Sequence, residues 1–254
     1  MNSLHSSTDV GANMNIEAAL AWPALALVFA GVFAGLWNAN RKRMHLLGFG
    51  VGFFALFLAM TVVIAAPCAN QPVITTGLHL LACISVMAIV WGSLQRLNQR
   101  TPIFAMCTLS VFSSALLYLA LENAEQEVAL LVHNEASGLL FAIGAVLLWT
   151  ARTTNMLDRI LVWTMSLLAI FSLLRPIVLF YLQTGPASLV QHKIEASAAS
   201  FVLFMVLTAM LGGVHVAIAI HEAIDIRHGS KRTDPVSGFL DQRTFELTGE
   251  RALA

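Results

Sequence analysis

Residues 44–66 read MHLLGFGVGFFALFLAMTVVIAA, an apolar run that contains no Asp, Glu, Lys or Arg. A helix needs about 20 mostly apolar residues to cross the hydrocarbon core of a bilayer, so this run predicts a transmembrane helix. Short polar breaks separate it from other runs of the same kind, which implies antiparallel neighbours. The sequence therefore predicts an all-α integral membrane protein, a seven-transmembrane helix bundle with helices at residues 16–37, 44–66, 73–92, 103–121, 128–151, 160–182 and 196–220.

The composition agrees with a membrane protein. Of the 254 residues, 58% are hydrophobic and only 11% are charged, whereas soluble domains contain about 25% charged residues. The formal net charge is zero and Lys and Arg are scattered, so nucleic-acid binding is not expected. Cys68, Cys83 and Cys107 are odd in number and lack metal-ligand spacing, which argues against a disulfide framework or a zinc site. Residues 1–15 contain no Lys or Arg and predict a short extracytoplasmic tail instead of a signal peptide.

The loops alternate between basic and non-basic along the chain. Basic residues follow the first, third, fifth and seventh helices, while the loop after the fourth helix is acidic and the remaining loops hold only Lys193. By the positive-inside rule the N-terminus lies outside and the C-terminus in the cytoplasm, as expected in a bacterial inner membrane. Tryptophans near the predicted inner ends agree, because aromatic residues gather at membrane interfaces. These tryptophans are Trp37, Trp91, Trp149 and Trp163.

Ionisable side chains inside the predicted helices are candidates for a functional site, because charge is costly within a membrane. Several lie at a similar depth, roughly 8–11 Å below the outer surface at about 1.5 Å per helical residue. They suggest an outward-opening pocket for an unknown small ligand, with Arg175 as the cation and Glu135 or Glu122 as its counter-ion. Hydrogen bonds to the ligand would come from His79, Tyr118 and His133.

Other interpretations of these residues stay open. They can form a purely structural polar network, since an arginine near the interface can extend toward water. His133 and Glu135 are two residues apart and therefore lie on nearly opposite helix faces. His79 and His133 are also suitable axial ligands for haem, which would give a redox or gas sensor. A small-solute transporter is a further alternative, although the inner halves of the fifth and sixth helices offer few polar groups for a transport path.

The seventh helix is predicted to continue into the cytoplasm through residues 221–233 as a signalling helix and linker. Ile220 and Ile224 are four residues apart and lie on one helix face, which favours packing against a second copy of the chain. Gly212 and Gly213 mark a candidate weak point in this helix.

The first helix contains Gly31 and Gly35, a small-xxx-small step that permits close helix approach within one bundle or between two copies.

The stretch DPVSGFLDQRTFE, residues 234–246, is polar and contains Pro and Gly, unlike the helices before it. It resembles the signature that begins the diguanylate cyclase (GGDEF) domain, D-x-L-T-G-L-x-N-R-R-x-F. Asp234, Gly238, Arg243 and Phe245 match that signature. The resemblance covers only residues 234–254, and the GG[DE]EF loop itself does not occur in this sequence.

The resemblance implies a membrane sensor and anchor, in which an outer or membrane signal passes through the seventh helix to a cytoplasmic domain that makes cyclic di-GMP from GTP. It also implies GTP and Mg²⁺ as ligands of that domain and a homodimer as the working form. Asp241 stands where the family has an Asn that contacts guanine, so it is a nucleotide-binding candidate. Without the catalytic loop, the chain as given is expected to be inactive alone, with no cofactor of its own.

Overall fold

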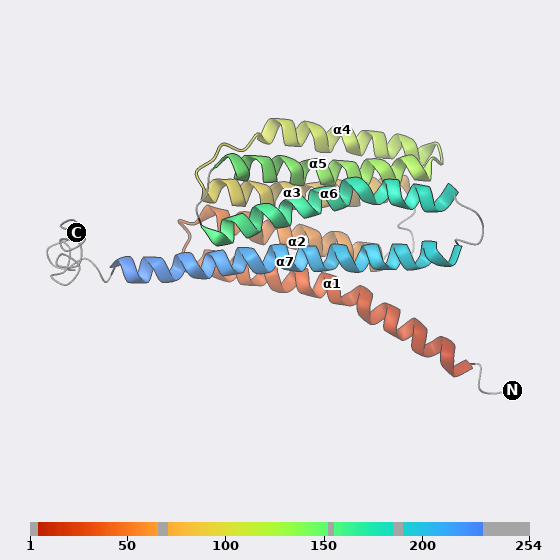
Figure 1. Ribbon diagram of the computed structural model, residues 1–254, viewed down its shortest axis with the longest axis horizontal. Coiled ribbons are helices and arrows are strands. Elements are labelled where there is room, and N and C mark those ends of the chain that lie inside the picture. The colour runs from red at the N-terminus through yellow and green to blue at the C-terminus, as the bar shows by residue number, and fades with distance from the viewer. Residues whose placement is uncertain (1–4, 66–70, 152–154, 185–189, 231–254) are drawn as a thin grey trace.

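The computed structural model describes residues 5–65, 71–151, 155–184 and 190–230, and these ranges form seven α-helices (Figure 1). The stretch that resembles the cyclase signature, including Asp241, lies outside the described residues. The helices are α1 His5–Ala39, α2 Met44–Ala65, α3 Pro72–Arg96, α4 Ile103–Glu122, α5 Gln126–Thr150, α6 Met156–Thr184 and α7 Val190–Ser230.

Each of the seven described helices is long and apolar enough to cross a membrane, which confirms the predicted all-α, seven-span architecture. The surface is apolar as well. The side chain of Phe104 is 86% exposed, and the exposed Trp149 and Trp163 rings pack edge to face with their centroids 6.3 Å apart. An apolar surface of this extent is unfavourable in water but contacts lipid in a bilayer. The chain is a multi-pass membrane protein.

The helices form a layered bundle in which α3 and α5 are central (Figure 1). The α3 helix packs against α2, α4 and α5, and α5 packs against α3, α4 and α6. The α4 helix packs against α3 and α5 at the edge of the bundle, while α7 lies beside α6 and touches α1 over a short contact. The α1–α2 and α3–α4 connections, the end of α5, the start of α6 and the C-terminal end of α7 share one end of the bundle, named the basic end below for Arg43 and Arg96.

Glycines bring α2 and α3 into close contact. A Cβ atom added at Gly48 would lie 2.7 Å from Cε3 of Trp91, and one added at Gly52 would lie 2.6 Å from Cγ1 of Ile89. In a membrane, small residues of this kind let helices pack closely, because neighbouring backbones can approach one another. Fully buried aromatic rings fill the space next to this contact, namely Phe33, Phe49 and Phe53.

The α7 helix continues without interruption through Gly212 and Gly213, the pair predicted as a candidate weak point. A Cβ atom added at Gly212 would lie 2.4 Å from Cε2 of Phe29, so this glycine makes room for an α1 side chain. In contrast, a Cβ atom at Gly31 or Gly35 would meet no atom within 4 Å. The small-xxx-small step of α1 therefore does not bring α1 close to another described helix of the same bundle.

The helices at the two ends of the chain are longer than the predicted spans. The α1 helix begins at His5, so part of the predicted polar tail is helical, and its N-terminal part diverges from the bundle (Figure 1). The α7 helix continues to Ser230, which confirms a helix that extends beyond the apolar span. In Figure 1 this end of α7 projects past the other helices at the basic end.

Candidate functional site

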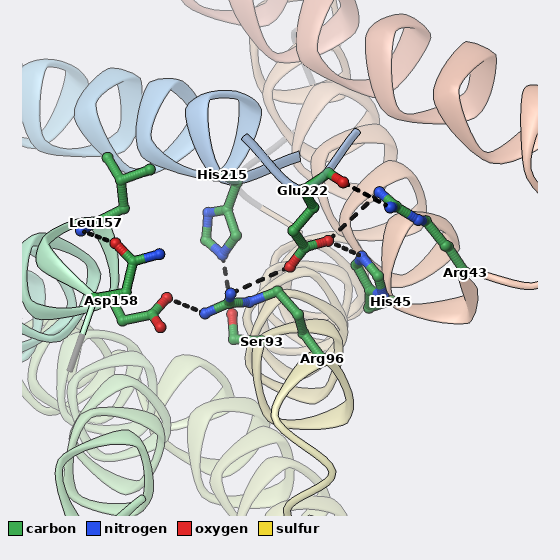
Figure 2. Close-up of polar contacts among 9 residues, drawn as sticks. Arg43, His45, Ser93, Arg96, Leu157, Asp158, His215 and Glu222 are labelled. Atoms are coloured by element: carbon green, nitrogen blue, oxygen red, sulfur yellow. Dashed lines mark hydrogen bonds and ion pairs between the residues drawn. The ribbon is translucent and has the colours of Figure 1, made fainter. Parts of the chain in front are cut away.

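A cluster of ion pairs ties the end of α7 to the rest of the bundle (Figure 2). Oε2 of Glu222 on α7 lies 3.5 Å from Nη1 of Arg43 and 3.5 Å from Nε2 of His45. Oε1 of Glu222 lies 3.2 Å from Nη1 of Arg96, which in turn pairs with Asp158. These five residues, named the ion-pair cluster below, join α7 to the start of α2, the end of α3 and the start of α6.

Local helix chemistry favours this arrangement. Arg96 lies in the last turn of α3 and Asp158 in the first turn of α6, where the helix dipoles stabilise a cation and an anion respectively. The Arg96 and Asp158 side chains are each only 8% exposed, so both charges are largely removed from water. Desolvation offsets much of the attraction in such a pair, yet removing one partner leaves an uncompensated charge. The ion-pair cluster therefore fixes the position of α7 more than it adds net stability.

A buried histidine extends the contact between α7 and α3. Nδ1 of His215 lies 2.7 Å from the carbonyl oxygen of Leu211, and Nε2 lies 2.9 Å from Oγ of Ser93 (Figure 2). A carbonyl oxygen only accepts, so Nδ1 of His215 carries a proton. Oγ of Ser93 also lies 2.8 Å from the carbonyl oxygen of Ile89, so its one hydroxyl hydrogen has two possible acceptors, that oxygen and Nε2 of His215. The ring of Phe49 packs on the imidazole, with centroids 4.1 Å apart. The hydrogen bond between His215 and Ser93 thus joins α7 to α3 in addition to the ion pairs.

A second polar cluster lies toward the opposite end of the bundle, where His79 of α3 meets His133 of α5. The two Nδ1 atoms are 2.9 Å apart, within hydrogen-bond distance. Nε2 of His79 lies 2.9 Å from Oγ of Ser113 on α4 and 3.6 Å from Sγ of Cys83. Two candidate residues from the sequence are therefore in direct contact and connect three helices; they are named the histidine pair below.

The histidine pair borders a cavity of about 640 Å³, which also reaches the ends of α2 and α4. Ligand sites in proteins commonly have volumes of about 300–1,000 Å³, so this space is large enough for a small molecule. Thr75 and the two histidines supply the polar part of its wall. The remaining wall is apolar and includes Met60, Val63, Leu78, Leu117, Leu121 and Leu130.

Arg175 lies apart from this cavity and borders a smaller one of about 370 Å³ between α6 and α7. Its Nη1 lies 3.4 Å from Oδ1 of Asn134. Within the described part of the chain, neither Glu135 nor Glu122 forms an ion pair with it. An amide therefore stands where a carboxylate counter-ion was expected.

The candidate residues of α4 do not border the histidine-pair cavity. Tyr118 is 37% exposed and Glu122 is exposed, whereas the α4 residues in the cavity wall are Leu117 and Leu121. Glu135 is half-buried on α5 and is not part of that wall either. Of the six candidate residues, His79 and His133 are the two that border this cavity.

The contact within the histidine pair also bears on the haem alternative. An axial ligand of haem must offer one ring nitrogen to the iron. Both ring nitrogens of His79 already contact protein atoms, Nδ1 that of His133 and Nε2 Oγ of Ser113, each at 2.9 Å. Among the described residues, no group of three or more His, Cys, Asp and Glu side chains is arranged to hold a metal ion.

The candidate signalling residues lie on the outer face of α7. Ile220 and Ile224 are 50% and 47% exposed, while Glu222 between them points into the ion-pair cluster. The two faces of this helix are therefore chemically distinct, one apolar and outward, the other charged and attached to the bundle.

The ion-pair cluster was not anticipated from the sequence. In the sequence the basic residues after the first and third predicted helices, which include Arg43 and Arg96, indicate only the cytoplasmic side, and Glu222 has no assigned role. One signal for it exists: Glu222 and Asp158 are acidic residues at ends of helices where the neighbouring loops are basic.

Comparison with known proteins gives no relative, since no protein-family model, curated protein or solved structure matches this chain. The function is inferred below from the residues themselves.

Proposed function

We propose that this chain is the sensor and anchor region of a membrane-bound diguanylate cyclase of the GGDEF type, located in a bacterial inner membrane. In this proposal a stimulus changes how α7 packs on the bundle, and α7 passes the change to a cytoplasmic domain that makes cyclic di-GMP from GTP. The cyclase part rests on the resemblance of residues 234–246 to the GGDEF signature.

The observation that supports signalling through α7 is the ion-pair cluster. Glu222 is attached to cations from two other segments at the point where α7 extends past the bundle. A partly buried carboxylate is poorly tolerated without its cation. The position of α7 therefore depends on whether Glu222 is paired or separated from its cations. A shift of α3 or α6 would change the contact and with it the position of α7.

The experiment measures cyclic di-GMP made by a fusion of residues 1–233 to an intact, active GGDEF domain. Glu222→Gln removes the charge that holds α7, so the basal output is expected to change severalfold while membrane insertion stays the same. Glu125→Gln, at an exposed carboxylate of the α4–α5 turn, serves as the matched control and should leave the output unchanged. An output equal to that of the parent fusion in Glu222→Gln would contradict signalling through this contact.

Orientation is tested separately, since the proposal needs the basic end in the cytoplasm. A reporter active only in the cytoplasm, fused after Ser230, should be active, and one inserted at Glu125 should be inactive. The opposite result would remove the proposed route from α7 to a cytoplasmic cyclase.

A further inference from the structure

Nε2 of His133, a residue that borders the cavity, makes no hydrogen bond with the described residues. His133 borders the cavity, and its Nδ1 is occupied by His79. The other cavity histidine has no free nitrogen, because both ring nitrogens of His79 contact protein atoms. Within the histidine pair, Nε2 of His133 is therefore the one ring nitrogen that can form a hydrogen bond with a ligand.

The contacts of Ser113 determine which atom carries each proton. Oγ of Ser113 lies 3.1 Å from the carbonyl oxygen of Ser110, which can only accept, so the Ser113 hydroxyl donates to it. Oγ of Ser113 then accepts a hydrogen bond from Nε2–H of His79. In neutral His79 the proton on Nε2 makes Nδ1 an acceptor, and Nδ1 of His133 must donate to it. Neutral His133 therefore presents a bare, accepting Nε2.

The opposite assignment of protons, in which the Ser113 hydroxyl donates to Nε2 of His79, is less favourable. If the Ser113 hydroxyl donated to His79, the Ser113 and Ser110 oxygens would face each other at 3.1 Å without a hydrogen between them. The donor chain from His133 through His79 and Ser113 to Ser110 satisfies every one of these contacts.

We propose that this cavity binds a membrane-soluble molecule with an apolar body and a hydroxyl group, and that the hydroxyl donates a hydrogen bond to Nε2 of His133. The apolar wall formed by residues such as Met60, Leu117 and Leu130 contacts the body of the ligand. A ligand that carries only acceptors leaves Nε2 of His133 unpaired and binds more weakly. This site goes beyond the proposed function, because it can bind its ligand whether or not a cyclase domain follows.

The test compares three probes of similar length in lipid nanodiscs that contain the whole chain. Decanol has a donor, decyl methyl ether has an acceptor alone, and 2-undecanone has a stronger acceptor alone. Binding is counted after subtraction of each probe's partition into empty nanodiscs. We expect saturable binding of decanol at one site per chain, about tenfold tighter than either acceptor-only probe, as for the loss of one buried hydrogen bond.

Variants assign the preference to the proposed atoms. His133→Phe keeps an aromatic ring but removes Nε2, so decanol should bind no tighter than the ether. Ser113→Ala removes the hydroxyl that fixes the protons, so the preference for decanol over 2-undecanone should fall toward parity. His221→Phe, an exposed histidine near the basic end, should retain the tenfold preference.

The result has clear alternatives. Absence of saturable binding would overturn the site itself. Equal or tighter binding of the ether or ketone to the parent chain would overturn the donor requirement, even if His133→Phe failed to fold. Because binding is measured without any cyclase output, failure of this proposal and failure of the proposed function are distinguishable.

Discussion

At the scale of single residues, Arg96 holds two carboxylates at once, Glu222 and Asp158. Arg96→Met keeps the apolar stem but leaves Asp158, only 8% exposed, without its cation. We expect the protein in detergent to lose about 3 kcal/mol of unfolding free energy, the range for one member removed from a buried pair. Chemical or thermal unfolding followed by circular dichroism measures the loss.

The control for this change is Arg100→Met, at an exposed arginine in the α3–α4 connection, which should alter stability by less than about 0.5 kcal/mol. Adding Asp158→Asn to Arg96→Met should recover part of the loss, because a neutral amide no longer needs a cation. If Arg96→Met were as stable as the parent protein, Asp158 would not depend on this pairing.

His215 and Ser93 allow a double-mutant cycle. Ser93→Ala leaves Nε2 of the fully buried His215 without its hydrogen-bond partner, which costs about 1–3 kcal/mol of unfolding free energy. In the double variant with His215→Phe the loss should be smaller than the sum of the single losses by about 1 kcal/mol, because neither partner is left unpaired. Strictly additive losses in the same unfolding assay would show that the two side chains do not interact.

The residue-level site was only partly predictable from the sequence. Depth along the helices grouped His79 with His133, and the two are in contact in the structure, because equal depth is a necessary condition for contact. Depth does not give the rotation of a helix about its axis, so Tyr118 and Glu122 were grouped with them although α4 presents Leu117 and Leu121 to the cavity. The ion-pair cluster needs the same missing information, since Glu222 reaches Arg43 only through the packing of α7.

At the scale of secondary-structure elements, the α1–α7 contact depends on Gly212. Gly212→Ala places a methyl group where Phe29 lies, 2.4 Å from an added Cβ, so this substitution should lower stability by about 1–3 kcal/mol. Gly213→Ala is the matched control, because its added Cβ meets nothing within 4 Å. The control should stabilise α7 by up to about 1 kcal/mol, the helix propensity difference between Ala and Gly.

Unfolding of the two variants side by side tests this contact. Adding Phe29→Leu to Gly212→Ala should recover stability, since the smaller side chain vacates the space. Equal stability of Gly212→Ala and Gly213→Ala would mean that α1 and α7 do not approach each other as closely as described.

Helix positions follow from the sequence more reliably than helix ends. Met44 and Ile103 were placed correctly as first residues of their helices, because charged or proline-containing breaks precede them. The ends of α1 and α7 differ by several residues, since hydropathy measures the apolar stretch and not the hydrogen-bonded helix. Adding residues to a helix that has already formed is easier than starting one, so a helix can continue past the apolar stretch.

At the scale of the whole molecule, α3 connects the two polar clusters. It carries His79 and Cys83 next to the cavity and Ser93 and Arg96 next to α7. His79 and Arg96 are separated by about 25 Å along the helix at about 1.5 Å per residue. A ligand that displaced or rotated α3 at the cavity would therefore move both side chains that hold α7, which gives the proposed sensor a continuous mechanical connection.

The remaining prediction concerns the assembly that this connection would control. Ile220 and Ile224 form an exposed apolar face on α7, opposite the residue that anchors the helix to its own bundle. If two copies pair through this face, cysteines introduced at Ile220 or Ile224 should form a disulfide between chains in oxidised membranes of a variant without native cysteines. Ile218→Cys is the matched control, because Ile218 is only 2% exposed and faces its own bundle. This variant should remain monomeric on non-reducing gels.

Cross-linking at Ile220 or Ile224 should also respond to Glu222→Gln, since release of α7 changes the spacing of the two helices. Equal cross-linking at all three positions would indicate random collision, and none at Ile220 or Ile224 would exclude pairing through this face of α7.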